Sequence, residues 1–404
     1  MDRETLVLRN TGMAEAFHQT PIKHLVRRSL LKLTSHLPIS HSADPGVQRI
    51  LIVRPDHLGD VLLTTPAIRT LRAALPDAEI HALVGEWSAE PLSYYDEIDH
   101  VLTLPFPGFK RGAAANALSP YQLALKSAGK LRKIGYHAAL ILRPDHWWGA
   151  LITFIAGVPI RVGYTHPDVE AFLTRGVAQQ REHAVLQNLR LIQAFLDQPY
   201  LVNDPIRLPL RFPVHEADRG VIDDELYART VRDDKPIVVI HPGAGTWVKR
   251  WEAERWAQVA DILAHQLDAV VVFTGGDHER DLVQDIQSRM KQHAISLVGE
   301  TGVGGLAALF QRARIVLGPD SGPLHLAVAV GTPTVTLFGA ADPVEFGSWG
   351  DSEKHPILFS DIACRPCRVL DWGSDDPAYH PCVRDISVAR VLEAANRALS
   401  ANQE

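Results

Sequence analysis

Short apolar runs rich in Val, Ile and Leu alternate with longer stretches of helical periodicity from about Gln48 onward. The first run, 49–54, precedes a stretch that we expect to be helical from Asp60 or Val61 to Leu75. An uninterrupted apolar run is typical of a strand buried on both faces of a parallel sheet. The alternation therefore predicts consecutive βαβ units and an α/β fold. Further strands in this half are expected at 79–84, 100–104, 137–142 and 161–164.

The alternation is interrupted between residues 198 and 236, where Pro and charged residues accumulate. This composition is typical of a domain boundary, and a chain of 404 residues is long enough for two domains. We therefore expect two doubly wound, Rossmann-like domains facing a cleft, at 48–215 and 216–385, and a last helix within 386–404. Strands of the second domain are expected at 237–240, 269–274, 295–298, 315–317 and 334–338.

Residues 1–47 precede the first predicted strand and contain a basic amphipathic helix. We expect it to begin at Thr20-Pro21 and to end before Pro38, because Pro suits the first turn of a helix but not its interior. Its apolar face carries Ile22, Leu25, Val26, Leu30, Leu33 and Leu37, and its basic residues Lys23, Arg27, Arg28 and Lys32 lie off that face. Residues 20–37 can lie on an anionic membrane surface, or dock on the protein itself or on a second subunit, and the pattern does not choose between these interpretations.

The amino-acid composition excludes some classes of function. Lys and Arg (41) are outnumbered by Asp and Glu (47), which gives a net charge of −6 and argues against nucleic acid as a partner. Three cysteines are too few for a disulfide framework and are normal in a reducing compartment, so we expect a cytoplasmic protein. The longest stretch without charged residues, 321–341, is interrupted by Pro323, Gly331 and Pro333, so no transmembrane helix is predicted.

Candidate chemistry in the first domain lies in loops that follow strands. Asp60 stands where its carboxylate can cap a helix or accept a proton from a hydroxyl group. The string 51–57, Leu-Ile-Val-Arg-Pro-Asp-His, is echoed by 140–146, Leu-Ile-Leu-Arg-Pro-Asp-His. Because both strings end strands of one predicted sheet, their polar side chains should collect at one edge and offer cations to an anionic substrate. The residues singled out here are Arg54, Arg143, Asp145 and His146.

Three loops of the second domain suggest a phosphate and nucleotide site. Thr246 and Lys249 follow a glycine-containing turn, which suits a phosphate group. Glu279 is placed either to bind a ribose diol or to begin a helix. The run 318–327 opens a helix, and its amides at Ser321, Gly322 and Leu324 are candidate pyrophosphate donors. Capping explains Asp320 and Pro323 but not His325 on so apolar a helix.

The cysteines are also candidate ligands. Cys364, Cys367 and Cys382, with His380, would supply the four ligands that a closed zinc site needs. Ordinary buried or surface thiols explain the same residues.

Taken in order, these motifs resemble glycosyltransferase family 9, the ADP-heptose-dependent heptosyltransferases of lipopolysaccharide synthesis. The resemblance covers about Arg49 to Val391. It rests on Leu58-Gly59-Asp60 with Thr65-Pro66-Ala67, His241-Pro242-Gly243 with Lys249-Arg250-Trp251, Gly275-Gly276 with Glu279, Asp320-Ser321-Gly322-Pro323-Leu324-His325-Leu326-Ala327, and Phe338-Gly339-Ala340-Ala341-Asp342-Pro343.

The resemblance implies a GT-B fold, with the acceptor bound by the first domain, the nucleotide sugar by the second, and the last helix crossing back to the first. It implies an inverting, metal-independent transfer of heptose or a related sugar, with no cofactor required. The donor would be ADP-heptose, and the acceptor a lipopolysaccharide core or another cell-surface glycan. The cysteine usage and the basic helix add the expectation that the enzyme is cytoplasmic or peripheral on the inner face of the cytoplasmic membrane.

The resemblance also implies roles for single residues. Asp60 would be the general base. This loop departs from the family pattern, because it carries Asp56 and His57 where many relatives have small hydroxyl residues, and His57 is therefore a rival base. The donor-binding residues would be Thr246 and Lys249 at the diphosphate, Glu279 at the nucleoside, Asp320 at the sugar, and Ser321, Gly322, Leu324 and His325 beside the phosphates. Two alternatives stay open: a nucleotide-sugar epimerase on the same two-domain plan, and a non-catalytic nucleotide-sugar-binding protein.

Overall fold

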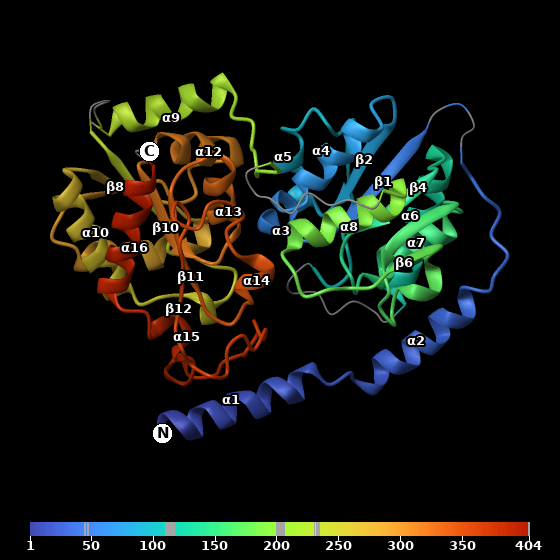
Figure 1. The fold of residues 1–404 in the computed structure, drawn as a ribbon, viewed down its shortest axis with the longest axis horizontal. Helices are drawn as coiled ribbons and strands as arrows, with labels where there is room; N and C mark the ends of the chain where they lie inside the picture. The colour runs from blue at the N-terminus through green and yellow to red at the C-terminus, as the bar shows by residue number, and fades with distance from the viewer. Residues whose placement is uncertain are drawn as a thin grey trace. The chain divides into compact units, whose positions relative to one another are not determined.

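The computed structural model describes residues 1–43, 46, 48–109, 118–198, 207–229, 231 and 235–402. They belong to two compact units, each drawn in Figure 1 as a sheet covered by helices. The first unit is Thr20–Asn203, and the second unit combines Met1–Gln19 with Asp204–Glu404.

The first unit contains a six-stranded parallel sheet in the order β3-β2-β1-β4-β5-β6. Its strands are β1 (Arg49–Arg54), β2 (Glu79–Val84), β3 (His100–Thr103), β4 (Ala138–Ile141), β5 (Ile160–Tyr164) and β6 (Arg175–Val177). Its helices are α2 (Ile22–Thr34), α3 (Leu58–Leu62), α4 (Thr65–Ala74), α5 (Ala89–Leu92), α6 (Ser119–Ile134), α7 (Trp147–Ile155) and α8 (Ala184–Leu196), with short turns η1 (Glu86–Ser88) and η2 (Glu170–Phe172).

Both faces of this sheet are covered, as its apolar strands require. Leu51 and Val53 of β1 share one hydrophobic cluster with residues of α6 and α7. Ile50 and Ile52, which point to the opposite face, are also buried, and α4 and α8 pack together on the remaining side.

The second unit repeats this plan with a parallel sheet in the order β12-β11-β10-β7-β8-β9. Its strands are β7 (Ile237–Ile240), β8 (Val270–Phe273), β9 (Ala294–Ser296), β10 (Ile315–Pro319), β11 (Thr334–Phe338) and β12 (Ile357–Phe359). Its helices are α1 (Arg3–His18), α9 (Glu216–Ala228), α10 (Ala253–Leu267), α11 (Arg280–Arg289), α12 (Val303–Arg312), α13 (Gly322–Ala329), α14 (Pro343–Phe346), α15 (Pro381–Arg384) and α16 (Val388–Ala401), with short turns η3 (Trp247–Lys249), η4 (Asp277–Glu279) and η5 (Pro377–Tyr379).

The two sheets share the strand order of a Rossmann fold, counted from the first strand of each unit. In each sheet the order reverses beside the first strand, between β1 and β4 in one unit and between β7 and β10 in the other. Ligands of open α/β sheets bind outside the carboxyl ends of the strands at this reversal. The loops after these four strands are therefore the places to look for chemistry.

The last helix, α16, packs on α10, β10 and β11 and buries Val391, Ala394 and Ala398 in the core of the second unit. That it also crosses back to the first unit stays a prediction. The two compact units divide between residues 203 and 204, earlier than the boundary expected at 215. Trp349 Nε1 donates to the Leu208 carbonyl at 2.7 Å and the Phe212 amide donates to Ala329, which ties residues 207–215 to the second unit.

The helix expected from Asp60 or Val61 to Leu75 is two helices, α3 and α4. Pro66 has no amide hydrogen to continue the ladder, and the Thr65 hydroxyl instead donates to the Leu62 carbonyl at 2.9 Å. The helices α1, α6 and α9 were not predicted from the sequence.

The extension 1–47 contains two helices that belong to different units. In α1, Leu6 joins the core of the second unit and the Asn10 side chain donates to the Tyr379 carbonyl at 2.8 Å. The predicted basic helix is α2, and it docks on the first unit through Leu31, Arg27 and Arg28. Its predicted apolar face is exposed, comprising Ile22, Leu25, Val26, Leu30, Leu33 and, just beyond the helix, Leu37.

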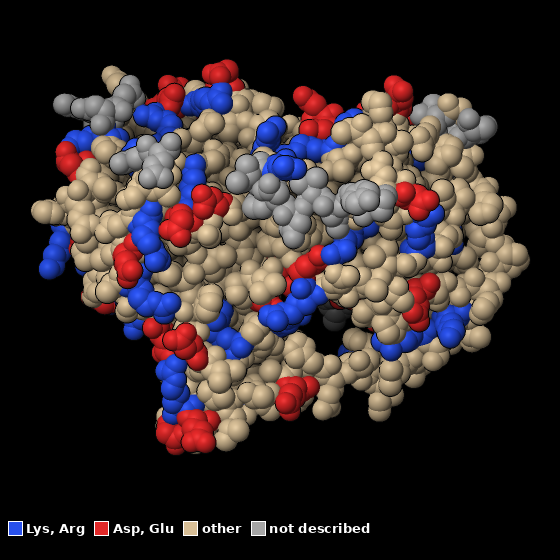
Figure 2. All heavy atoms as spheres, in the orientation of Figure 1, with Lys and Arg blue, Asp and Glu red and all other residues tan. Residues whose placement is uncertain are grey.

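Charges of both signs are interspersed on the face shown in Figure 2. In the described part of the chain, none of the helices combines the length and the apolar character that a membrane span requires.

Candidate functional site

Charged side chains after β1 and β4 form one ion-pair network in the first unit. Arg54 Nε lies 2.8 Å from Asp56 Oδ2, and Arg54 Nη2 lies 3.1 Å from Asp60 Oδ1. Arg143 pairs with the other oxygen of Asp56, and its Nε lies 2.6 Å from Asp145 Oδ1. The two strand-end strings therefore meet at one edge of the sheet, as the neighbouring positions of β1 and β4 require.

Asp56 is the centre of this network, which was not predicted from the sequence. Burial opposes ionisation of its carboxyl group, but the guanidinium groups of Arg54 and Arg143 hold its pKa below the usual value. His146 is buried close to Asp56, and burial lowers its pKa to about 4. Neither ring nitrogen of His146 has a hydrogen-bond partner among the described residues. His146 is therefore neutral near pH 7.

The two candidate bases lie on the same short segment. Asp60 is in the first turn of α3, where its side chain is 32% exposed and Arg54 orients its carboxylate. His57 precedes α3, is exposed, and lies beside the Trp87 ring with 5.6 Å between centroids. Both side chains are accessible to a ligand. Of the two, the oriented carboxylate is the better placed to receive a proton in a fixed geometry.

In the second unit, Lys249 and Asp320 join the loops after β7 and β10. Lys249 Nζ lies 2.6 Å from Asp320 Oδ2, and both side chains are largely buried. Thr246 lies three residues before Lys249, and Ser321 directly follows Asp320. Both hydroxyl groups are buried without a hydrogen-bond partner in the described residues. Because buried hydroxyl groups nearly always have partners, these two, on the loops that carry Lys249 and Asp320, indicate a place for ligand oxygens.

Glu279 lies in the same unit but is already engaged by the protein. Its Oε2 accepts from the Gly276 amide at 2.9 Å and lies 3.9 Å from Nε2 of the buried His241. Nδ1 of His241 lies 3.1 Å from the Thr274 hydroxyl, so this histidine links the ends of β7 and β8. Burial lowers its pKa. The interpretation of Glu279 as a helix-opening residue is therefore realised in this structure, and a nucleoside contact stays a prediction.

Glycine is required where β10 passes β7. A Cβ atom on Gly318 would lie 2.5 Å from the carbonyl oxygen of His241. The close approach lets α13 begin beside the Lys249 loop.

The amides at the start of α13 are fewer than predicted. The Leu324 amide donates to the Ser321 carbonyl at 3.2 Å, which removes it from the expected phosphate donors and leaves Ser321 and Gly322. His325 is buried on the same helix near Asp320 and Lys249, and burial lowers its pKa. A neutral imidazole there adds no charge to the site.

The cysteines offer little support for a metal. Cys364, Cys367, Cys382 and His380 line one small cavity, but His380 Nε2 is paired with Asp375 at 2.8 Å. Burial raises the pKa of all three thiols, which opposes the thiolate form that binds metals. In the described ranges, the ligand atoms that lie close enough to share an ion belong to other residues, Glu79, His81 and His100.

Two Rossmann-like units in one chain, each with polar side chains at the reversal of its sheet, are the architecture of GT-B glycosyltransferases. The model of glycosyltransferase family 9 (heptosyltransferase) matches residues 124–371, more than half of the chain. The chain therefore belongs to glycosyltransferase family 9 and is a glycosyltransferase, which confirms the resemblance.

Individual relatives agree with this assignment. The chain is 25% identical over 356 residues to lipopolysaccharide heptosyltransferase 2 of Escherichia coli K12, covering 87% of this chain and 98% of that protein. A family 9 glycosyltransferase structure from Veillonella parvula matches with a TM-score of 0.73 and 24% identity, covering 89% of this chain and 99% of the other. The structure of E. coli ADP-heptose lipopolysaccharide heptosyltransferase II gives a TM-score of 0.67 and 21% identity, covering 88% and 100%.

Proposed function

We propose that the protein transfers heptose from ADP-heptose to a lipopolysaccharide core or another cell-surface glycan. The family assignment and the names of its relatives support this reaction. The observation that carries it is the group of Lys249 and the unpartnered hydroxyls of Thr246 and Ser321 in the second unit. A cation, two hydroxyls and the amides at the start of α13 suit a diphosphate.

The donor then reacts by a single displacement. The acceptor hydroxyl attacks the anomeric carbon of the sugar, the bond from that carbon to the diphosphate breaks, and ADP leaves with the electron pair. Negative charge grows on the departing diphosphate, and Lys249 stabilises it. When the diphosphate binds, its charge competes with Asp320 for Lys249, which frees the Asp320 carboxylate to contact the sugar.

The proton of the acceptor hydroxyl passes to Asp60. Arg54 holds this carboxylate in one orientation, and Arg143 beside Asp56 offers a cation to an anionic acceptor. His57, Asp145 and His146 are the remaining acceptor-side candidates. Of these, His57 is the alternative base.

The lipid-linked acceptor also suggests a location. We infer that α2 lies on the anionic inner face of the cytoplasmic membrane. Arg27, Arg28 and Leu31 hold the helix to the first unit, so its exposed apolar side chains point away from the protein. Lys23 and Lys32 are also exposed and fall at the two borders of that apolar face at helical spacing. An apolar stripe bordered by lysines suits an interfacial helix on anionic lipid better than a second protein subunit.

Vesicle sedimentation tests the membrane proposal. Leu30→Glu with Leu33→Glu should abolish binding to vesicles containing phosphatidylglycerol, and Lys23→Gln with Lys32→Gln should weaken it about tenfold. Leu125→Glu, at an exposed leucine of α6, is the matched control and should bind normally. Unchanged vesicle binding by the Leu30/Leu33 variant would show that α2 is not the membrane-binding element. If instead the parent protein forms a concentration-dependent dimer and this variant does not, the apolar face of α2 binds a second copy of the chain.

Release of nucleoside diphosphate tests the reaction. The protein is mixed with ADP-heptose and other nucleotide sugars, with and without a lipopolysaccharide acceptor that lacks the heptose. A transferase releases ADP only with the acceptor. Conversion of the sugar without acceptor would identify an epimerase, and binding without either reaction would identify a non-catalytic binding protein.

A further inference from the structure

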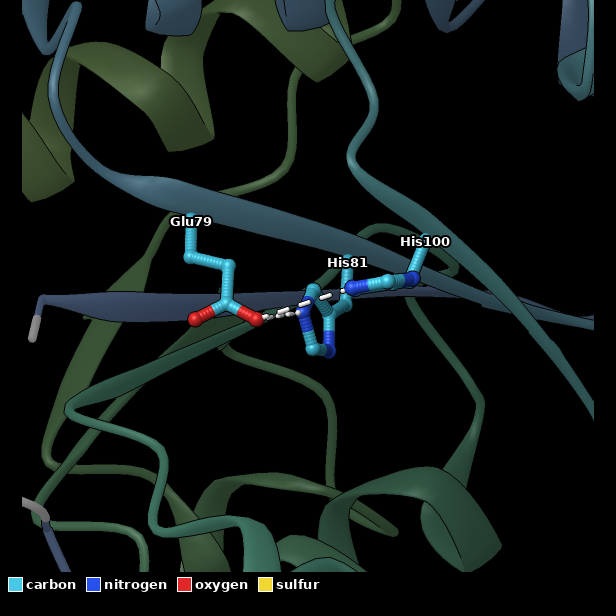
Figure 3. Close-up of side chains that lie close together, drawn as sticks. All are labelled: Glu79, His81 and His100. Carbon is cyan, nitrogen blue, oxygen red and sulfur yellow. Dashed lines mark hydrogen bonds and ion pairs between the residues drawn. The ribbon is translucent and has the colours of Figure 1, made fainter.

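Outside the loops described above, three side chains of the first unit gather on one face of two neighbouring strands. Glu79 and His81 are two residues apart on β2 and therefore point to the same face. His100 begins β3 and is the registered partner of His81 across the parallel pair. Figure 3 shows both imidazole rings directed toward the Glu79 carboxylate.

One carboxylate oxygen of Glu79 faces a ring nitrogen of His81 and a ring nitrogen of His100. Glu79 Oε2 accepts from Arg49 Nε at 2.6 Å, while Oε1 lies 2.9 Å from His81 Nε2 and 3.7 Å from His100 Nε2. One ligand atom from each of the three residues lies within 4.8 Å of the other two. In a tetrahedral zinc site with bonds of about 2.1 Å, ligand atoms lie roughly 3.4 Å apart. The two distances from Glu79 Oε1, 2.9 and 3.7 Å, lie on either side of that value.

Neighbouring groups prepare His81 for this role. Its Nδ1 lies 2.7 Å from the hydroxyl of the buried Tyr136. An ion between Nε2 and Glu79 takes the place of the proton that now lies between them, and with the remaining proton on Nδ1 the imidazole donates to Tyr136 and offers the lone pair of Nε2 to the ion. A hydrogen bond on the far nitrogen is the usual way in which proteins orient a metal-binding histidine. His100, whose side chain is 62% exposed, provides an entry path and the freedom to close the longer distance.

We propose that Glu79, His81 and His100 bind a divalent transition-metal ion, for which Zn²⁺ is the probe. Two imidazoles and one carboxylate are the ligand set of three-ligand zinc sites, with water in the fourth position. The site lies at the amino ends of β2 and β3, whereas Asp60 follows the carboxyl end of β1. Arg49 and Arg54 mark the two ends of β1, roughly 16 Å apart at strand rise. The ion fastens the edge strand β3 to β2 and takes no part in sugar transfer.

Calorimetric titration of Zn²⁺ into the full-length, tag-free protein tests this site. Cys364→Ser and Cys367→Ser are introduced first so that thiols do not contribute. We expect saturable binding of one ion, weakened at least about tenfold by His100→Ala and by Glu79→Gln. Tyr136→Phe should weaken it roughly tenfold by releasing His81. His265→Ala, at an exposed histidine of the second unit, is the matched control and should bind normally.

Thermal unfolding supplies the second measurement. Zn²⁺ should raise the melting temperature of the parent protein and of His265→Ala, but not that of His100→Ala. Without zinc, His100→Ala should melt like the parent, because the side chain is mostly exposed. An absence of saturable binding, or equal binding by His100→Ala and the parent, would overturn the proposal. Neither result bears on transferase activity, which is measured separately as release of ADP.

Discussion

In the proposed donor site, Lys249 is the residue on which donor binding should depend most directly. In this structure its charge is matched by Asp320, 2.6 Å away, and a bound diphosphate would compete for it. Lys249→Ala should weaken ADP binding by about 10- to 100-fold, the range for one hydrogen bond to a charged group. Calorimetry with ADP measures this. Lys235→Ala, at an exposed ion pair of the same unit, is the control, and an unchanged ADP affinity for Lys249→Ala would remove Lys249 from the donor site.

His146 gives the first unit a defined pH dependence. Burial lowers its pKa from 6.5 to about 4, so below pH 6.5 the unfolded chain binds a proton that the folded protein does not. The contribution of His146 to the free energy of unfolding therefore has its full value above about pH 6.5. It falls as the pH drops toward 4, by about 3 kcal/mol at most. His146→Gln should flatten that part of the curve of unfolding free energy against pH. An identical slope in both proteins would contradict the buried neutral imidazole.

The site residues were predictable where a strand end fixes their position. Arg54, Arg143 and Asp145 could be grouped because β1 and β4 are neighbours in the commonest doubly wound order. Their pairing around Asp56 could not, because side-chain partners depend on rotamers that spacing does not specify. The sequence also suggested a free Leu324 amide, but the backbone of α13 turns so that this amide donates to the Ser321 carbonyl.

Among the secondary-structure elements, the positions of the strands could be predicted more reliably than the surfaces on which the helices pack. A short apolar run such as that of β1 or β7 can form little other than a buried strand. The apolar face of an amphipathic helix, in contrast, does not indicate which part of the protein packs against it. The last helix illustrates this, since its stripe buries against α10, β10 and β11 of its own unit. In α2 the stripe is exposed, and the helix is held by the residues on its other side.

The packing of α16 leads to a stability prediction. Leu399 is buried in the core of the second unit, so Leu399→Ala should cost about 2 kcal/mol in the free energy of unfolding, measured with urea. Amide exchange should increase in β10 and β11, the strands that α16 covers. Asn396→Ala, on the exposed side of α16, should change neither quantity. Faster exchange confined to the first unit would show that α16 packs there instead.

At the scale of the whole molecule, the chain divides its chemistry between two similar units. The paired arginines and carboxylates lie in the first unit, and the lysine with unpartnered hydroxyls lies in the second. The net charge of −6 conceals this division. Two domains were predictable from the interruption near 198–236. That α1, at the start of the chain, belongs to the second unit was not, because Arg9 and Asn10 of this helix bond to residues 366 and 369 positions away.

We propose that this family 9 enzyme transfers heptose with Asp60 as its base. The most direct test is the acceptor-dependent rate of ADP release from ADP-heptose by Asp60→Asn, with His57→Gln measured in parallel. Loss of the base should lower turnover by about 100- to 10,000-fold while ADP affinity stays unchanged, and His57→Gln should remain active. Near-normal turnover of Asp60→Asn, with turnover lost in His57→Gln, would contradict the account and assign the base to His57.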